Sequence, residues 1–172
     1  RFNINFMFKL KLNNSYYTNT FLTIMNKLNV IILILFLFIF SSCKKESDFS
    51  KIDQGIILQY ISQNNLNAQS TSSGLHYVIN DPGNGDTPNV NSTVTVAYKG
   101  TLTDGTIFDQ SDLSGATFPL SNVIQGWQEG IPLFNEGGSG ILLIPSALGY
   151  GTQTVNSIPS NSVLIFEVSL IR

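Results

Sequence analysis

The fold of this chain is organised around one stretch, Val123-Ile124-Gln125-Gly126-Trp127-Gln128-Glu129-Gly130, which contains its only tryptophan. Val123, Ile124 and Trp127 follow the i, i+3, i+4 spacing, which predicts one short helical turn with a single apolar face. We expect Pro132 to end this turn. A helix of this length is not stable in water by itself. It therefore has to be held by its surroundings, which the sequence predicts to be almost entirely β-strand.

Strands are predicted on both sides of the helical turn. Val94 and Val96 alternate with polar residues, which is the period of a half-buried strand, and Asp104-Gly105 is a hairpin signal that returns the chain along it. The predicted strands cover residues 75–80, 94–102, 106–109, 118–120, 141–144 and 163–171. An antiparallel sheet with one short helix against it is an α+β architecture.

The composition excludes several classes of protein. The net charge is −2 and no cluster of Lys or Arg accompanies the aromatic residues, so the chain lacks the electrostatic footprint of a nucleic-acid-binding protein. A single cysteine excludes an internal disulfide and a cysteine-based zinc site. Because there is also only one histidine, we expect no structural metal site. The 42% of apolar residues is enough to bury a core.

The first part of the chain has the pattern of a leader segment that is removed from the mature protein. Residues 1–24 show no clear period and begin with arginine, so we expect an extension upstream of the natural start at Met25. The apolar run at residues 30–40 is too short for an easy bilayer span of about 20 residues. It fits the apolar segment of a signal peptide, which we place at residues 25–42.

The serines that precede the lone cysteine, Cys43, resemble the lipobox of bacterial lipoproteins, although Phe40 stands where leucine is usual. The resemblance implies lipidation of Cys43, including a fatty acyl chain such as palmitate, and cleavage before it. Two or three acyl chains form a stable membrane anchor without a spanning helix. We therefore expect a lipid-anchored protein of the cell envelope, at the outer membrane or facing the periplasm. A plain secretory signal and an uncleaved anchor are the alternatives.

Residues 43–73 are expected to be a lipid-anchored tether that contains a short amphipathic helix. A polar segment at residues 44–48 is followed by apolar side chains at helical spacing, with Asp48 or Ser50 as the capping residue. These apolar residues are Ile52, Ile56, Ile57, Tyr60 and Ile61. The helix is expected to pack on the following domain or to pair with a partner. Residues 64–73 are a polar connector.

Four motifs in residues 74–172 resemble, in order, the signatures of the FKBP family of peptidyl-prolyl cis-trans isomerases. They are Tyr98-Lys99-Gly100-Thr101-Leu102-Thr103-Asp104-Gly105-Thr106-Ile107-Phe108-Asp109, the stretch at residues 123–130, Tyr150-Gly151, and Ile158-Pro159 with the strand that follows. The resemblance implies a half-wrapped antiparallel sheet around one short helix. It also implies catalysis of rotation about X–Pro amide bonds, without a cofactor.

The resemblance also implies a set of site residues. The catalytic residues would be Tyr98, Asp109 and Tyr150, and the substrate-binding residues Phe108, Phe118, Val123, Ile124, Trp127, Ile158 and Phe166. Trp127 would form the floor of the pocket, and the Ile124 N–H and Tyr150 hydroxyl would bind the peptide. Spacing alone also fits aromatic residues that are simply core. Asp109 would orient Tyr98 or act on the twisted carbonyl, or else merely cap a turn.

We expect the partners to be proline-containing polypeptides, chiefly exported proteins during folding, and macrolide inhibitors of the family. The protein is expected to be a monomer. Two alternatives are a lipoprotein that binds prolyl peptides as a chaperone does without turnover, and a structural lipoprotein that docks through the helix around residues 52–61. His76, on the first predicted strand, is expected to be a surface or strand residue.

Overall fold

A computed structural model describes residues 44–172, with side chains from Phe49 onward. The predicted extension at residues 1–24, the signal peptide at residues 25–42 and the lipidated Cys43 lie outside the described residues. These three assignments therefore stay predictions.

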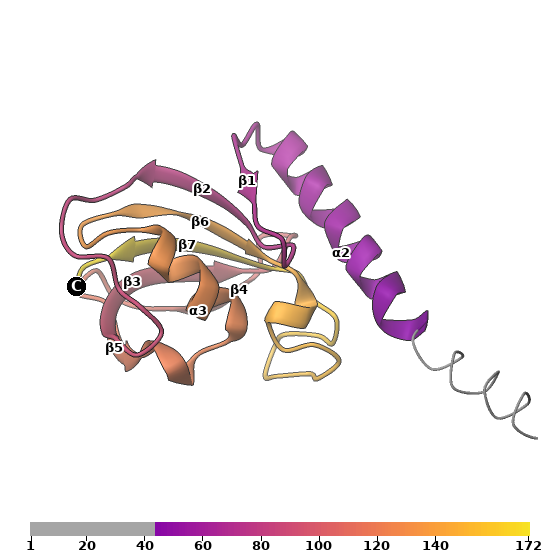
Figure 1. Ribbon diagram of the computed structural model, residues 1–172. Coiled ribbons are helices and arrows are strands. Elements are labelled where there is room, and N and C mark those ends of the chain that lie inside the picture. The colour runs from indigo at the N-terminus through magenta and orange to yellow at the C-terminus, as the bar shows by residue number, and fades with distance from the viewer. Residues whose placement is uncertain (1–43) are drawn as a thin grey trace, which may run out of the picture. The chain divides into compact units, whose positions relative to one another are not determined.

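The described chain forms one open antiparallel sheet of seven strands with helices against it (Figure 1). The strands are β1 (Gln69–Ser70), β2 (His76–Asp81), β3 (Thr93–Thr101), β4 (Ile107–Gln110), β5 (Ala116–Pro119), β6 (Ser139–Ile144) and β7 (Leu164–Leu170). Their order is β1-β2-β6-β7-β3-β4, and β5 pairs with the first half of β3. The α+β architecture predicted from the sequence is confirmed.

Strand β3 is central because it pairs with β7 along one edge and with β5 and then β4 along the other. Val94 and Val96 point into the core and are almost fully buried, as their alternation with polar residues predicts. On the opposite face Lys99 lies across from Glu167, with 3.4 Å between Nζ and Oε1. Both side chains are exposed, so this ion pair contributes little to stability.

The short helix α3 (Gln125–Gly130) lies against the inward face of β6. A Cβ atom at Gly126 would collide with the side chain of Ile144, and one at Gly130 would come within 2.8 Å of Leu142. The two glycines therefore let the helix approach the strand. Pro132 does not end the helical turn as predicted, because the chain continues as the 3-10 helix η3 (Ile131–Leu133), in whose first turn the missing proline N–H costs nothing.

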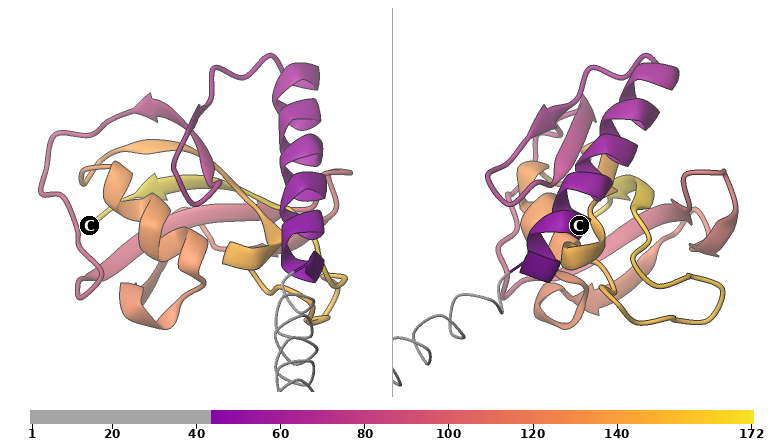
Figure 2. Two further views of the ribbon diagram at one scale, coloured as in Figure 1. Left: turned by 45° about the vertical axis from the view of Figure 1, so that its right-hand side comes forward. Right: turned by 90° about the vertical axis from the view of Figure 1, so that its right-hand side faces the viewer.

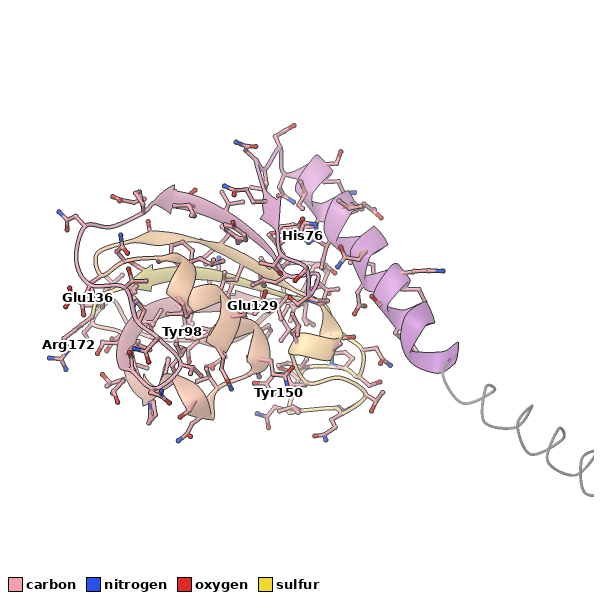
Figure 3. All side chains as sticks on the ribbon, in the orientation of Figure 1. His76, Tyr98, Glu129, Glu136, Tyr150 and Arg172 are labelled. Atoms are coloured by element: carbon pink, nitrogen blue, oxygen red, sulfur yellow. The ribbon has the colours of Figure 1, made fainter. Side chains whose placement is uncertain are left out.

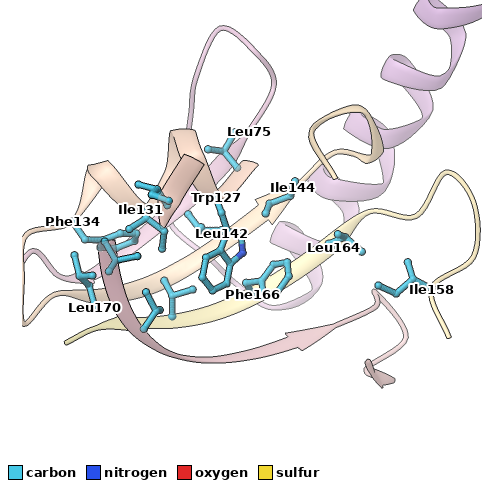
Figure 4. Packing of buried hydrophobic residues seen from close by; sticks show 14 residues of the cluster. Leu75, Trp127, Ile131, Phe134, Leu142, Ile144, Ile158, Leu164, Phe166 and Leu170 are labelled. Carbon is cyan, nitrogen blue, oxygen red and sulfur yellow. The ribbon is translucent and has the colours of Figure 1, made fainter. Parts of the chain in front are cut away.

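The main core fills the space between the sheet and α3 (Figure 4). Apolar side chains come from β3, β6 and β7, and Trp127 of α3 lies among them with Phe166 beside it. The buried members are Leu75, Val94, Val96, Leu120, Trp127, Ile131, Phe134, Leu142, Ile144, Ile158, Leu164, Phe166, Val168 and Leu170. This packing supplies the support that a six-residue helix lacks in isolation.

A second, smaller core attaches the helix α2 (Lys44–Gln63), which runs alongside the sheet (Figure 2), to the outward side chains of β6 and β7. Ile57 is fully buried there against Leu143 and Ile165. Ile52 does not lie on the buried face that its helical spacing predicts: it is 55% exposed, whereas Asp53 beside it is only 1% exposed. Among the described residues, none of the helices combines the length and apolar character that a membrane span requires.

Two other local expectations need correction, and a third, for His76, is confirmed. Helix α2 begins at Lys44, so the predicted polar tether at residues 44–48 is helical; charged residues without proline or glycine do not prevent a helix. The connector at residues 64–73 contains the two-residue strand β1. His76 lies on a strand as predicted but is only 8% exposed, and its Nδ1 is 3.2 Å from the carbonyl oxygen of Gly74.

Candidate active site

A cavity of about 320 Å³ opens between α3 and the strands β3, β4, β5 and β7. Its lining is mainly aromatic and aliphatic, with a few polar groups, which is the composition of a small-ligand or peptide site. The lining residues are Tyr98, Asp109, Phe118, Asn122, Val123, Ile124, Trp127, Tyr150 and Phe166.

The floor of the cavity is the indole of Trp127, which is 4% exposed. Three aromatic rings meet it edge to face: Tyr98 and Phe166 with ring centroids 5.2 Å away, and Phe118 at 5.4 Å. Edge-to-face contacts are the favoured geometry between aromatic rings. Each neighbour comes from a different strand, so the sheet fixes the orientation of the indole and leaves a rigid apolar surface.

The polar rim of the cavity is built around Asp109. Tyr98 on β3 donates a hydrogen bond from its hydroxyl to Asp109 Oδ2 on β4, at 2.8 Å. The pairing of Gly100 with Asp109 in the sheet brings the two side chains together. Tyr150, on the loop after β6, also lines the cavity, and Figure 3 labels it together with Tyr98. Two hydroxyls and one carboxylate therefore face a space whose other lining residues, apart from Asn122, are apolar.

The environment keeps both tyrosines protonated. Burial, together with the hydrogen bond to Asp109 and the negative charge of that carboxylate, raises the pKa of Tyr98 to about 12. Burial, and then the charge of Asp109, also raises the pKa of Tyr150. At neutral pH the rim therefore offers Tyr150 as a hydrogen-bond donor, while the Tyr98 proton is used by Asp109.

A backbone donor is available at the edge of the floor. Ile124 precedes α3 in an extended conformation, and its carbonyl accepts the N–H groups of Trp127 and Gln128. Within residues 44–172 no acceptor pairs with the N–H of Ile124 itself. An unpaired N–H beside an apolar pocket is a natural partner for the carbonyl of a bound peptide.

The structure brings eight of the ten predicted site residues around this cavity. Phe108 does not line it but contacts Phe166 edge to face, with centroids 5.4 Å apart. Ile158 is 5% exposed within the core and lies near Leu164, away from Trp127 (Figure 4). Asn122 lines the cavity and was missed, because a polar residue in a short 3-10 helix has no sequence pattern that shows which way it faces.

The raised pKa of Tyr98 predicts how stability changes at alkaline pH. Because Tyr98 binds its proton more tightly in the folded state than at the ordinary value of 10.0, its contribution to stability is complete below about pH 10 and is lost as pH rises to about 12. Urea unfolding of the wild type and Tyr98→Phe at several pH values measures this. The difference in free energy of unfolding between the wild type and Tyr98→Phe should become smaller as pH rises from about 10 to about 12. A difference that stays constant over that range would contradict a raised pKa of Tyr98.

The fold and the cavity together define a domain of the prolyl isomerase type: an open antiparallel sheet around one short helix, with an aromatic pocket between them. A sequence model of the FKBP-type peptidyl-prolyl cis-trans isomerases matches residues 85–171, about half of the chain. The chain belongs to the FKBP-type peptidyl-prolyl cis-trans isomerase family.

Several known proteins are similar to this chain. An FKBP-type isomerase, FkpA, of Aeromonas hydrophila is 48% identical over 105 residues, which are 60% of this chain and 39% of that protein. The outer membrane protein MIP of Legionella longbeachae is 45% identical over 102 residues, 58% of this chain and 44% of its own. The chain thus spans less than half the length of these relatives.

A solved structure supports the fold independently of these alignments. The crystal structure of a peptidyl-prolyl cis-trans isomerase from Pseudomonas syringae matches with a TM-score of 0.65 and 28% identity. The match covers 77% of this chain and 98% of that one. Within residues 44–172 no group of three or more His, Cys, Asp or Glu side chains is arranged to hold a metal ion.

Proposed function

We propose that this protein is a peptidyl-prolyl cis-trans isomerase that accelerates X–Pro rotation in exported polypeptides. The observation that carries the proposal is the mainly aromatic cavity around Trp127, which is lined by only a few hydrogen-bonding side chains. The family of the chain supports the same activity. The assignment of catalytic and binding roles to single residues belongs to this proposal.

The chemistry needs a suitable environment more than a reactive group. The barrier to rotation about a peptide bond is about 18–20 kcal/mol, so an uncatalysed X–Pro bond takes tens to hundreds of seconds to isomerise. When the bond is twisted, amide resonance is lost, and the group is less charge-separated than in either planar form. An apolar pocket that excludes water therefore favours the twisted state over the planar ones.

Each side of the cavity has a role in this scheme. The proline ring lies on the indole of Trp127, between Phe118 and Phe166. The Ile124 N–H donates to a carbonyl of the bound peptide and fixes the chain on one side of the rotating bond. The Tyr150 hydroxyl holds the other side, and Asp109 lies close to the twisting carbonyl. Holding the two ends while the bond between them turns is a positioning effect.

The proposed location of the protein rests on its sequence. Lipidation of Cys43 would anchor it to a membrane of the cell envelope, and the similarity to the outer membrane protein MIP of Legionella longbeachae supports that location. Its substrates would then be proline-containing proteins that fold after export. Macrolide inhibitors of the family would occupy the same aromatic cavity.

A protease-coupled prolyl-peptide assay tests the proposal. The full chain, purified in detergent, is expected to accelerate isomerisation in proportion to its concentration and to be inhibited by a macrolide of the family. Binding of a proline-containing peptide, measured by the fluorescence of Trp127, serves as the parallel readout. Binding without acceleration would overturn the enzyme assignment in favour of a non-catalytic, chaperone-like lipoprotein.

A further inference from the structure

One carboxylate of helix α2 is buried without a positive partner. Asp53 is 1% exposed, and its Oδ2 accepts two hydrogen bonds from Ser146, from the backbone N–H at 2.8 Å and from the hydroxyl at 2.6 Å. Within the described part of the chain, the sole ion pair joins Lys99 to Glu167. A buried charge is costly unless hydrogen bonds compensate it, and an apolar residue would serve packing alone better.

The residue that Asp53 holds is directly connected to the candidate active site. Ser146 begins the 3-10 helix η4 (Ser146–Leu148), and its carbonyl accepts the N–H groups of Gly149 at 3.0 Å and Gly151 at 2.8 Å. Those two glycines are the neighbours of Tyr150 on either side. The N–H and hydroxyl of Ser146 are thus held by α2, while its carbonyl binds the residues on both sides of Tyr150.

We infer that Asp53 is a positioning residue, which acts through Ser146 to set the place of the Tyr150 hydroxyl at the cavity rim. The inference rests on the proposed function, because it assigns Tyr150 a role in holding the peptide. It gives α2 a task that neither a tether nor a docking helix would have. Helix α2 thereby contributes, through Asp53, to the geometry of the candidate active site.

The attachment of α2 does not itself require Asp53. Ile57 is fully buried in the second core, and Gln54 donates a hydrogen bond from Nε2 to the carbonyl of Gly74 at 2.8 Å. Neither of these contacts involves the segment around Tyr150. Gln54→Ala is therefore a matched control, since it removes one hydrogen bond of the same helix, one position along, without touching Ser146.

The first test compares Asp53→Ala, Asp53→Asn and Gln54→Ala in the full chain. Asp53→Ala is expected to lower kcat/KM roughly three- to fivefold. This factor is smaller than the full net effect of one typical hydrogen bond, because the Tyr150 hydroxyl is displaced only in part. Asp53→Asn should recover most of the activity, because its amide oxygen can accept the same two hydrogen bonds. Gln54→Ala should stay close to the wild type. Equal activity in all four proteins would overturn the inference.

The second test asks whether Asp53 acts through Tyr150. In a Tyr150→Phe background, Asp53→Ala should cause little further loss of kcat/KM, because the hydroxyl to be positioned is already missing. If the two losses instead multiply fully, Asp53 does not act through that hydroxyl. Urea unfolding of each variant measures whether it is folded at the assay temperature, and only folded variants are compared.

A readout independent of activity separates this inference from the proposed function. Amide hydrogen exchange at Gly149 and Gly151 should become roughly tenfold faster in Asp53→Ala but not in Gln54→Ala, because the loop opens locally. Unchanged exchange would overturn the inference even if the wild type is an active isomerase. If exchange is faster in Asp53→Ala but the wild type has no isomerase activity, the link from Asp53 to the Tyr150 loop holds and only the proposed function is overturned.

Discussion

Trp127→Ala is expected to lower the free energy of unfolding by about 3–5 kcal/mol and to reduce kcat/KM for prolyl peptides on the order of a hundredfold. The side chain is 4% exposed and is in contact with three aromatic rings, so its removal leaves a void that the surrounding strands cannot close. The same void removes the floor of the cavity. Urea unfolding and the coupled assay measure the two effects on one protein.

The control for this variant is Phe134→Ala. Phe134 is 1% exposed and belongs to the same core, but it does not line the cavity. Its removal should cost a similar free energy of unfolding while kcat/KM stays within a fewfold of the wild type. Trp127→Leu, which keeps part of the volume, gives a second, more stable variant. If the Phe134 and Trp127 variants lost activity equally, the indole would be only a core residue.

The parts of the fold that the sequence predicted well are those in which a local pattern has one physical solution. Val94 and Val96 alternate with polar neighbours, and only one face of β3 is buried in the main core. Trp127 on a short helix between two glycines required close packing, and Gly126 and Gly130 do lie directly over Ile144 and Leu142. At such positions the residues that determine the local structure are close together in the chain, so the sequence alone is enough to predict it.

The features that the sequence could not predict depend on contacts between distant segments. Ile52 fits a helical apolar stripe, yet the rotation of α2 on the sheet exposes it and buries Asp53 instead. The partner of Asp53 is Ser146, which lies 93 residues further along the chain. Ile158 matches a family motif, but the local course of its loop directs it into the core rather than into the cavity.

Asp109 is the one charged residue of the cavity, and its replacement should have the second largest effect on activity. The carbonyl oxygen of a planar amide carries more negative charge than that of a twisted one, so a nearby carboxylate destabilises the planar form more. At about 4 Å a unit charge near a protein surface interacts by about 4 kcal/mol. A partial change in the carbonyl charge is then worth on the order of 1–2 kcal/mol, or roughly ten- to thirtyfold in rate.

Asp109→Leu and Asp109→Asn should therefore both lower kcat/KM by about that factor. Because the side chain is exposed, the free energy of unfolding should change by about 0.5 kcal/mol or less. Asp109→Asn is the decisive variant, since its amide oxygen can still accept the hydrogen bond that the Tyr98 hydroxyl donates at 2.8 Å. Full activity in Asp109→Asn, together with a loss in Tyr98→Phe equal to that in Asp109→Leu, would show that Asp109 only orients Tyr98. A large loss in Asp109→Asn and a small one in Tyr98→Phe are the results expected if the charge itself favours the twisted amide.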